Sequence, residues 1–165
     1  MKLNRSVWII ILIGFSQWLA AVDSHCSVDE LVVFNCSTGK KTVSVCASKA
    51  ISTTSGYLQY RFGRLGAPEM LIPVDMKLPC ADIQANTLMF SGGGGAYIRF
   101  NNHRFSYVVY TAMGRGWGEK AGIVVEKDHQ LQVKLSCKTP LLSELGPDFF
   151  EQAGLIQDQI GFDLP

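Results

Sequence analysis

Short segments in which apolar and polar residues alternate follow one another along most of this chain. In Tyr57–Phe62, for example, every second residue is apolar, which is the two-residue period of a half-buried β-strand. The pattern predicts an all-β domain, an antiparallel barrel or sandwich of about eight short strands. Turn-forming residues separate the other segments of this kind, which are Leu31–Cys36, Thr42–Ala47, Glu69–Pro73, Thr87–Ser91, Tyr97–Phe100, Phe105–Thr111, Ala121–Lys127 and Gln130–Cys137.

The connections between these segments make the prediction more specific. Thr38–Lys41 is expected to turn the first hairpin, and residues 128–129 the last one. Glu69–Pro73 is expected at the edge of a sheet, because the proline that ends it has no N–H group for a further strand. We expect Val74–Ala85 to be a loop.

The first 24 residues have the pattern of a secretory signal peptide. Lys2 and Arg5 precede an almost unbroken apolar run, Val7–Ala21, and small residues suited to cleavage follow. An uncleaved membrane anchor is the alternative interpretation, because the run is close to the shortest length that spans a bilayer. We expect cleavage of residues 1–24 and a bacterial protein that is periplasmic or secreted, with no stable membrane span.

The mature chain is expected to consist of a β-domain, residues 25–138, and an acidic C-terminal segment, residues 139–165. The β-domain has 13 basic and 8 acidic side chains, whereas the C-terminal segment has five acidic side chains and no basic one. Pro147–Ala153 is typical of a short helix, with proline in its first turn and Gly154 at its end. We expect a solvated acidic tail against a mildly basic body. The basic residues form no run, so we expect no nucleic-acid partner.

Five cysteines are present, at positions 26, 36, 46, 80 and 137, and an exported chain is expected to form disulfides. In the first hairpin Cys36 would face Val43, which leaves Cys46 about 10 Å further along and out of disulfide reach. Cys36 and Cys137 lie on the apolar faces of their strands, so we expect a disulfide between them. The pairing of the other three cysteines stays open. No cysteine pair has the spacing of a zinc knuckle, and we expect neither a metal site nor a cofactor.

Two glycine-rich segments are the candidate binding elements. Four glycines between two strand-like segments are expected to form a loop, because glycine loses the most backbone entropy when it is ordered in a strand. Met113–Gly118 is a second glycine-rich connection, and a hairpin between the two would place both at one end of a sheet. It contains an arginine and a tryptophan, residue types that often dominate binding energy. The alternative is that both segments are tight turns without a partner. The candidate binding residues are Ser91, Gly92, Gly93, Gly94, Gly95, Tyr97, Arg115 and Trp117.

The sequence contains no recognisable catalytic motif. The glycine run is not a phosphate-binding loop, because no Lys-Ser or Lys-Thr pair follows it and the next element is a strand. Ser91 does not lie in a G-x-S-x-G elbow. We expect His25 at the frayed N-terminus, and His103 and His129 in hairpin turns, where histidines are more often solvated than catalytic. We therefore expect a protein that is not an enzyme and has no catalytic residues.

The loop residues resemble those of a known family. Ser91–Tyr97, followed by Tyr107–Thr111 and a basic glycine loop, is similar to the periplasmic C-type lysozyme inhibitors. The resemblance implies a small β-barrel in which a loop serine and a basic residue enter the lysozyme cleft and engage its catalytic carboxylates. In this chain they would be Ser91 and Arg115, and the family's disulfide would join the two cysteines paired above.

A second resemblance covers most of the mature chain. Phe34-x-Cys36, Val43–Cys46 and Gly56–Gly63 are similar to a group of small exported bacterial proteins to which no role is assigned. Three functions follow from the residues as alternatives. We favour an exported binding domain whose partner is a protein, with a lysozyme as the concrete candidate. The others are a structural or envelope-interaction protein in which the loops are only turns, and an envelope enzyme.

Overall fold

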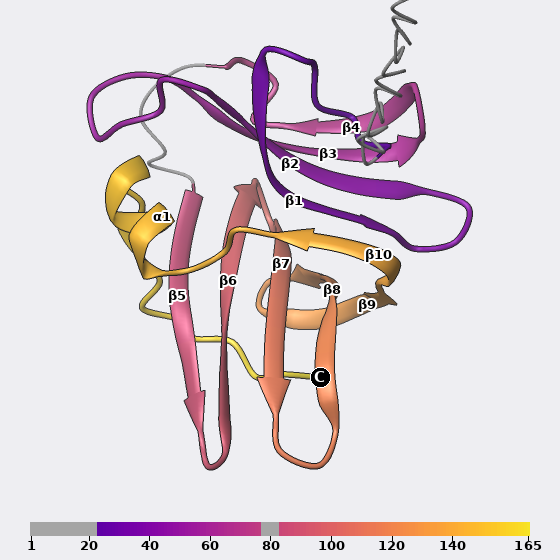
Figure 1. Ribbon diagram of the computed structural model, residues 1–165, viewed down its shortest axis with the longest axis vertical. Helices are drawn as coiled ribbons and strands as arrows, with labels where there is room; N and C mark the ends of the chain where they lie inside the picture. Colours follow the sequence, from indigo (N-terminus) through magenta and orange to yellow (C-terminus); the bar gives the residue numbers. More distant parts are fainter. Residues whose placement is uncertain (1–22, 77–82) are drawn as a thin grey trace, which may run out of the picture.

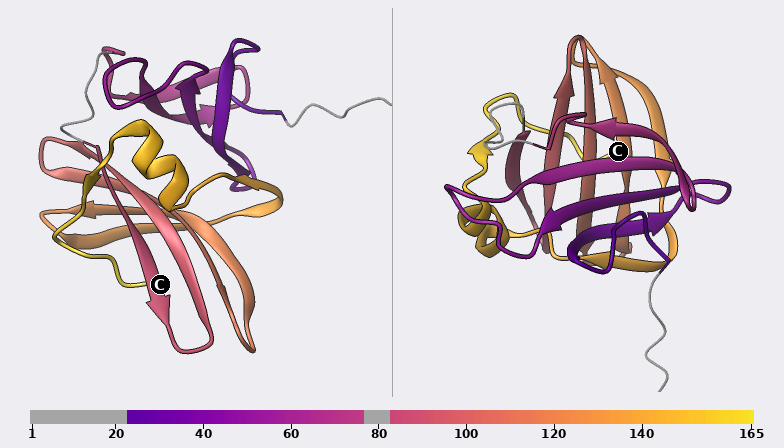
Figure 2. Two further views of the ribbon diagram at one scale, coloured as in Figure 1. Left: turned by 60° about the vertical axis from the view of Figure 1, so that its left-hand side comes forward. Right: turned by 90° about the horizontal axis from the view of Figure 1, so that it is seen from above.

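The computed structural model describes residues 23–76 and 83–165, which form two packed β-sheets, called sheet A and sheet B (Figures 1 and 2). The all-β prediction is confirmed. Neither sheet closes into a barrel, so the sandwich is the alternative that fits. The described residues contain eleven strands rather than about eight, because the C-terminal segment adds two to the nine predicted from alternation. The strands of the two sheets cross at a steep angle (Figure 1).

Sheet A has the strand order β10-β1-β2-β3-β4, and all its neighbours are antiparallel. The β1–β2 register pairs Cys36 with Val43, as predicted. β4 is an edge strand, as expected of the segment that ends at Pro73. The strands are β1 (Glu30–Ser37), β2 (Thr42–Ser48), β3 (Leu58–Arg64), β4 (Ala67–Ile72) and β10 (Lys138–Ser143).

Sheet B has the order β11-β5-β6-β7-β8-β9 and is antiparallel except for the short parallel β11–β5 pair. β5 begins inside the predicted loop Val74–Ala85, of which residues 77–82 lie outside the described residues. The β5–β6 and β7–β8 hairpins reach well beyond sheet A (Figure 1). The strands are β5 (Ile83–Phe90), β6 (Gly93–Asn102), β7 (Phe105–Gly114), β8 (Gly118–Lys127), β9 (Gln130–Ser136) and β11 (Ile156–Gln157).

The helix α1 (Pro147–Ala153) has the predicted bounds. Gly154 ends it in the left-handed conformation, with φ at 62°, and its N–H group donates to the carbonyl oxygens of Glu151 and Phe150. That termination is typical of a glycine C-cap. The helix buries Phe149 and Ala153 in the main core, so the C-terminal segment is part of the fold.

The main core lies between the inner faces of the two sheets, that is, the faces turned toward each other. Its β-branched and aromatic side chains suit a pleated surface buried on one side. The predicted disulfide between Cys36 and Cys137 is confirmed and joins β1 to the residue after β9, with a Cα–Cα distance of 5.5 Å. The residues buried at its centre include Phe34, Val43, Val45, Leu58, Tyr60, Ile98, Phe100, Val109 and Ile123.

A second disulfide joins Cys26 to Cys46. Two disulfides are in keeping with an oxidising, extracytoplasmic environment. Cys80 lies outside the described residues, as does nearly all of the predicted signal peptide 1–24. Within the part of the chain that the structure describes, no helix has the length and apolar character needed to cross a membrane.

Part of the outer face of sheet B, turned away from sheet A, is also buried. Residues 158–165, here called the C-terminal strap, cross this face and cover a second apolar cluster. The ring of Phe162 in the strap lies 5.1 Å from that of Tyr97 and 5.4 Å from that of Tyr110. The expectation of a solvated tail is therefore wrong for the strap, because its apolar side chains have an uncovered aromatic sheet face to pack on.

The predicted inward face of β9 is only partly correct. Leu135 packs against the main core, but Leu131 and Val133 are exposed. A register shift in the β8–β9 pairing lies between Val125, which pairs with Val133, and Glu126, which pairs with Leu131. Because one extra residue reverses the faces of a strand, Leu131 lies on the outer face of sheet B.

Candidate functional site

The candidate binding residues at the two hairpin turns lie together at the free end of sheet B (Figure 1). The N–H group of Arg115, in the β7–β8 turn, donates to the carbonyl oxygen of Gly92, in the β5–β6 turn, at 2.9 Å. Ser91, Gly92, Arg115 and Trp117 are all exposed there. The sequence-based expectation that both connections lie at one end of a sheet agrees with this geometry.

The glycine run is not the loop that was predicted. Only Gly92 lies in the turn, with φ at 77°, whereas Gly93, Gly94 and Gly95 are the first residues of β6. A Cβ atom on Gly93 would lie 2.2 Å from the Met113 carbonyl oxygen. One on Gly95 would lie 2.3 Å from the Thr111 carbonyl oxygen. The glycines thus permit a close approach of β6 to β7, and pairing on both sides compensates for their entropy.

Two aromatic rings cover this glycine backbone on the outer face. The centroids of Phe90 and Trp117 are 5.7 Å apart, and a Cβ atom on Gly114 would lie 2.2 Å from the Trp117 ring. Lys120 places its Nζ 5.0 Å from the Trp117 centroid, which is a cation–π distance. Trp117 keeps 40% of its surface exposed and is therefore held in place yet accessible.

Tyr97, the remaining predicted site residue, does not belong to this surface. It lies further along β6 on the outer face of sheet B, where Phe162 covers it and only 1% of it is exposed. Burial, with the Asp158 carboxylate nearby, raises the pKa of the Tyr97 phenol. Sequence reasoning placed Tyr97 at the start of a strand beside the glycine loop and made it a candidate binding residue, whereas the strap removes it from solvent.

Two exposed methionines belong to this end of the sheet. Met89 was missed, and Met113 began the predicted connection Met113–Gly118 without being listed as a binding residue. Met89 is 92% and Met113 63% exposed, and the register pairs both of them with Gly94. Methionine is common on adaptable binding surfaces because its side chain is flexible and polarisable. We call Met89, Ser91, Gly92, Met113, Arg115 and Trp117 the tip surface.

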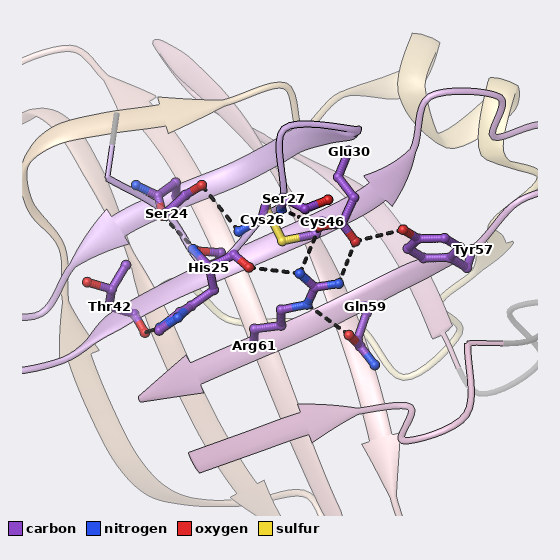
Figure 3. Close-up of a disulfide and its surroundings, with 12 residues drawn as sticks. Ser24, His25, Cys26, Ser27, Glu30, Thr42, Cys46, Tyr57, Gln59 and Arg61 are labelled. Carbon is purple, nitrogen blue, oxygen red and sulfur yellow. Dashed lines mark hydrogen bonds and ion pairs between the residues drawn. A yellow bond between two sulfur atoms is a disulfide. The ribbon is translucent and has the colours of Figure 1, made fainter. Parts of the chain in front are cut away.

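A polar network on the outer face of sheet A was also missed (Figure 3). Glu30 accepts hydrogen bonds from the Ser27 N–H group at 2.6 Å, from the Tyr57 hydroxyl at 2.7 Å and from both terminal nitrogens of Arg61. Arg61 also donates to the carbonyl oxygen of His25 and to the side chain of Gln59, each at 2.8 Å. The network lies against the Cys26–Cys46 disulfide.

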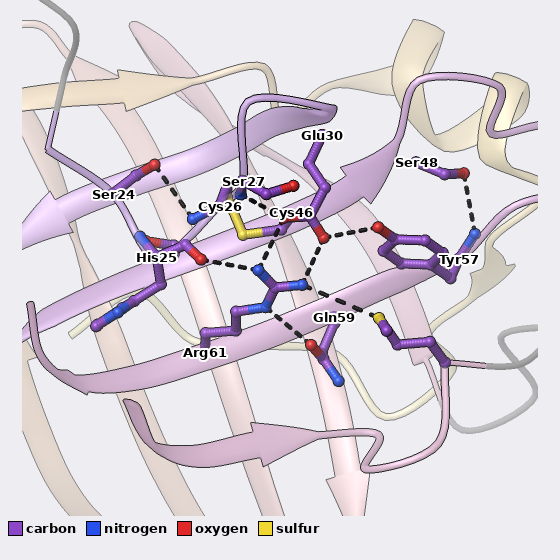
Figure 4. A network of polar contacts seen from close by, with 12 residues as sticks. Ser24, His25, Cys26, Ser27, Glu30, Cys46, Ser48, Tyr57, Gln59 and Arg61 are labelled. Carbon is purple, nitrogen blue, oxygen red and sulfur yellow. Dashed lines mark hydrogen bonds and ion pairs between the residues drawn. A yellow bond between two sulfur atoms is a disulfide. The ribbon is translucent and has the colours of Figure 1, made fainter. Parts of the chain in front are cut away.

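The contacts of this network hold the residues before β1 on sheet A (Figure 4). Burial alone would raise the pKa of Glu30, but hydrogen bonds from Arg61, Ser27 and Tyr57 outweigh it and lower that pKa. A carboxylate held ionised by several donors is poorly suited to proton transfer. Cys26 and Cys46 lie close to Glu30, but their sulfur atoms are joined to each other and cannot act as thiolate metal ligands.

His25 is held by this network rather than frayed. Its N–H group donates to the Ser44 hydroxyl at 2.9 Å, and its Nε2 lies 3.2 Å from the Thr42 carbonyl oxygen. Such contacts fix the N-terminal end of the described chain on sheet A. The other two histidines, His103 and His129, lie in hairpin turns as expected, each with a positive φ.

A second charged cluster lies under the C-terminal strap. Arg99 on β6 is fully buried and donates from Nε to the fully buried Asp158 at 2.8 Å. Its other nitrogens donate to Glu126 and, at 2.7 Å, to the carbonyl oxygen of Gly161. These bonds to Asp158 and Glu126 raise the pKa of Arg99 against the opposing effect of burial. Arg99 lies in the segment Tyr97–Phe100, which was predicted to be a strand, but nothing local in the sequence indicated that a remote acidic residue covers it.

Comparison of the chain with protein-family models, with curated proteins and with solved structures gave no match.

Proposed function

We propose that this chain is an exported, non-enzymatic binding domain that engages a protein partner through the tip surface. The observation that carries the proposal is that exposed arginine, tryptophan and methionine side chains all lie at the free end of two paired hairpins, with the methionines on the inner face of sheet B and Trp117 on its outer face. Arginine and tryptophan are enriched among the residues that dominate interface energies. The two disulfides support export to an oxidising compartment.

The backbone of the tip surface favours binding because it is ordered before a partner arrives. Hydrogen bonding across β5, β6, β7 and β8 continues to the turns, and the Arg115–Gly92 bond joins the turns themselves. The glycines leave space around Ser91, so that the hairpins are narrow enough to enter a cleft. A preorganised surface loses less conformational entropy on binding.

The concrete partner is a lysozyme, as the resemblance to the C-type lysozyme inhibitors suggests. In this proposal the Arg115 guanidinium and the Ser91 hydroxyl approach the catalytic carboxylates of the lysozyme cleft. A guanidinium matches a carboxylate with two parallel hydrogen bonds, which gives both energy and orientation.

The test is inhibition of cell-wall lysis by the protein and by its Ser91→Ala and Arg115→Ala variants. The wild type should inhibit, and each variant should lose at least about tenfold in inhibition, since charged hydrogen bonds contribute roughly 1.5–3 kcal/mol. Arg104→Ala is the matched control, because Arg104 is an exposed arginine in the β6–β7 turn at the other end of the sheet. Equal thermal midpoints would show that the variants fold. Failure of the wild type to inhibit any lysozyme would remove this partner.

One observation favours a second function, that of a structural or envelope-interaction protein. The close approach of β6 to β7 accounts for Gly93 and Gly95 without any partner. If the hairpins serve only the fold, the Ser91 and Arg115 substitutions will leave capture of envelope proteins by the domain unchanged. A pull-down from envelope extract, with Arg104→Ala as control, separates the two functions.

A further inference from the structure

A groove of about 490 Å³ lies between the C-terminal strap and the β8–β9 hairpin, away from the tip surface. Leu131 and Ile160 flank it from the two sides and remain 60% and 52% exposed. Its volume is within the range of small-molecule sites. Its apolar lining consists of Val124, Leu131, Ile160, Phe162, Leu164 and Pro165.

The charge in and beneath this groove is unbalanced. Glu126 lines the groove and is bound from below by Arg99, which also pairs with Asp158. Asp163 adds a further carboxylate at the rim. Arg99 thus pairs with two carboxylates, and Asp163 is a third carboxylate in the groove lining. The described lining residues include no lysine or arginine, only His129 as a titratable base. The nearest lysines belong to its border, where Lys134 pairs with Val124 and Lys120 donates to the Pro165 carbonyl oxygen at 3.5 Å.

A second cation beside Glu126 would be attracted to its carboxylate. The Glu126 side chain is 13% exposed, so a charge next to it is less screened than at an open surface. The apolar walls would bury a hydrocarbon chain of the ligand, at about 0.8 kcal/mol for each CH₂ group in the usual transfer scale. A ligand that satisfies both features is a cation on an apolar chain.

We propose that this groove binds an amphiphilic amine of the alkylammonium type, with its ammonium group against Glu126 and its chain along Leu131, Ile160 and Leu164. The ammonium donates hydrogen bonds to the Glu126 carboxylate. It also compensates the negative charge that remains because the single Arg99 guanidinium is shared by Glu126 and Asp158. The site lies toward the end of β8 opposite the tip surface, so it is independent of the proposed function.

Calorimetric titration of the disulfide-bonded protein with octylammonium, octanol and octanoate tests the proposal. Octylammonium should bind saturably, octanol at least about tenfold more weakly because it lacks the charge, and octanoate not measurably. Equal affinity for octanol would overturn the proposal, since the groove would then select only apolar character. Absence of saturable octylammonium binding would overturn it as well.

Two matched variants locate the binding. Leu131→Lys introduces a competing cation at the groove and should abolish octylammonium binding, whereas Val133→Lys adds the same charge on the other face of β9 and should not. Both positions are exposed, so both variants should fold. Glu126→Gln should remove the preference for octylammonium over octanol. Equal loss of binding in the two lysine variants would contradict the assignment, while Arg115→Ala should bind as the wild type does.

Discussion

Two arginine–carboxylate clusters hold the two ends of the described chain on the outer faces of the two sheets, and they do so differently. On sheet A, Arg61 and Glu30 fix the residues before β1, and the Cys26–Cys46 disulfide ties the same segment covalently. On sheet B, Arg99 and Asp158 anchor the strap, and the described strap residues have no covalent tie to the sheet.

The two clusters differ in their access to water as well. The Arg61 side chain is 11% exposed, whereas those of Arg99 and Asp158 are fully buried. A buried ion pair is weak evidence of net stabilisation, but loss of one partner is costly because the other is left charged in a poorly solvating environment. The strap therefore depends on an intact charge cluster, whereas the N-terminal segment is also held by the Cys26–Cys46 disulfide.

The largest effect is expected from Arg99→Met. This change leaves Asp158 and Glu126 without their cation and should lower the free energy of unfolding by about 3–5 kcal/mol. Denaturant unfolding measures it, with Arg104→Met, an exposed arginine paired with Asp128, as the control. The deficit should shrink in acid, where the orphaned carboxylates take up protons. A loss no larger than that of the control would show that the strap does not depend on Arg99.

A smaller effect is expected when the covalent tie on sheet A is removed. The double variant Cys26→Ala/Cys46→Ala opens a loop with a sequence separation of 20 and should cost about 3 kcal/mol in the chain-entropy model. The Arg61–Glu30 pair should still hold the segment, so its protection from hydrogen exchange should persist. Free exchange of the segment in this variant would mean that the disulfide alone holds it.

The smallest effect concerns Glu30 and is a dependence on pH. Its pKa is lowered in the folded protein from an ordinary value of 4.5. The ionised Glu30 therefore contributes stability that is present above about pH 4.5 and is lost as the pH falls through the lower folded-state pKa. Glu30→Gln should be less stable than the wild type by about 1–3 kcal/mol at neutral pH. That difference should narrow below pH 4.5 in acid unfolding curves, and a difference independent of pH would refute the role of ionisation.

Much of sheet pairing could be predicted because its signals are local. The turn residues at Thr38–Lys41 and at 128–129 formed the expected hairpins, and Gly154 ended the expected helix. The Cys36–Cys137 disulfide followed from two strand faces that each point inward. The tip surface was predicted in part, since two glycine-rich turns separated by a hairpin must lie at one end of a sheet.

The incorrect predictions have a common physical origin: they concern which neighbouring strand or distant segment packs against each residue. Gly93–Gly95 were assigned to a loop because glycine loses the most backbone entropy when it is ordered. In the structure β5 and β7 pair with these residues on both sides, and only residues without a side chain allow the neighbouring backbone to approach so closely. Leu131 changed faces because of one bulge. Tyr97 and Arg99 lie in a strand that was correctly predicted, yet a segment about 60 residues later in the chain buries both.

By itself, the sequence determined the all-β class, the hairpins, the short helix and one disulfide of this protein, because period, turn chemistry and strand face are properties of neighbouring residues. The tertiary structure alone decided that the end of the acidic C-terminal segment forms the strap, that Asp158 in the strap pairs with a buried arginine, and that a groove opens beside it. Those features depend on which distant segment excludes water from a given face, and exclusion of water sets both the burial of apolar groups and the strength of charge pairing.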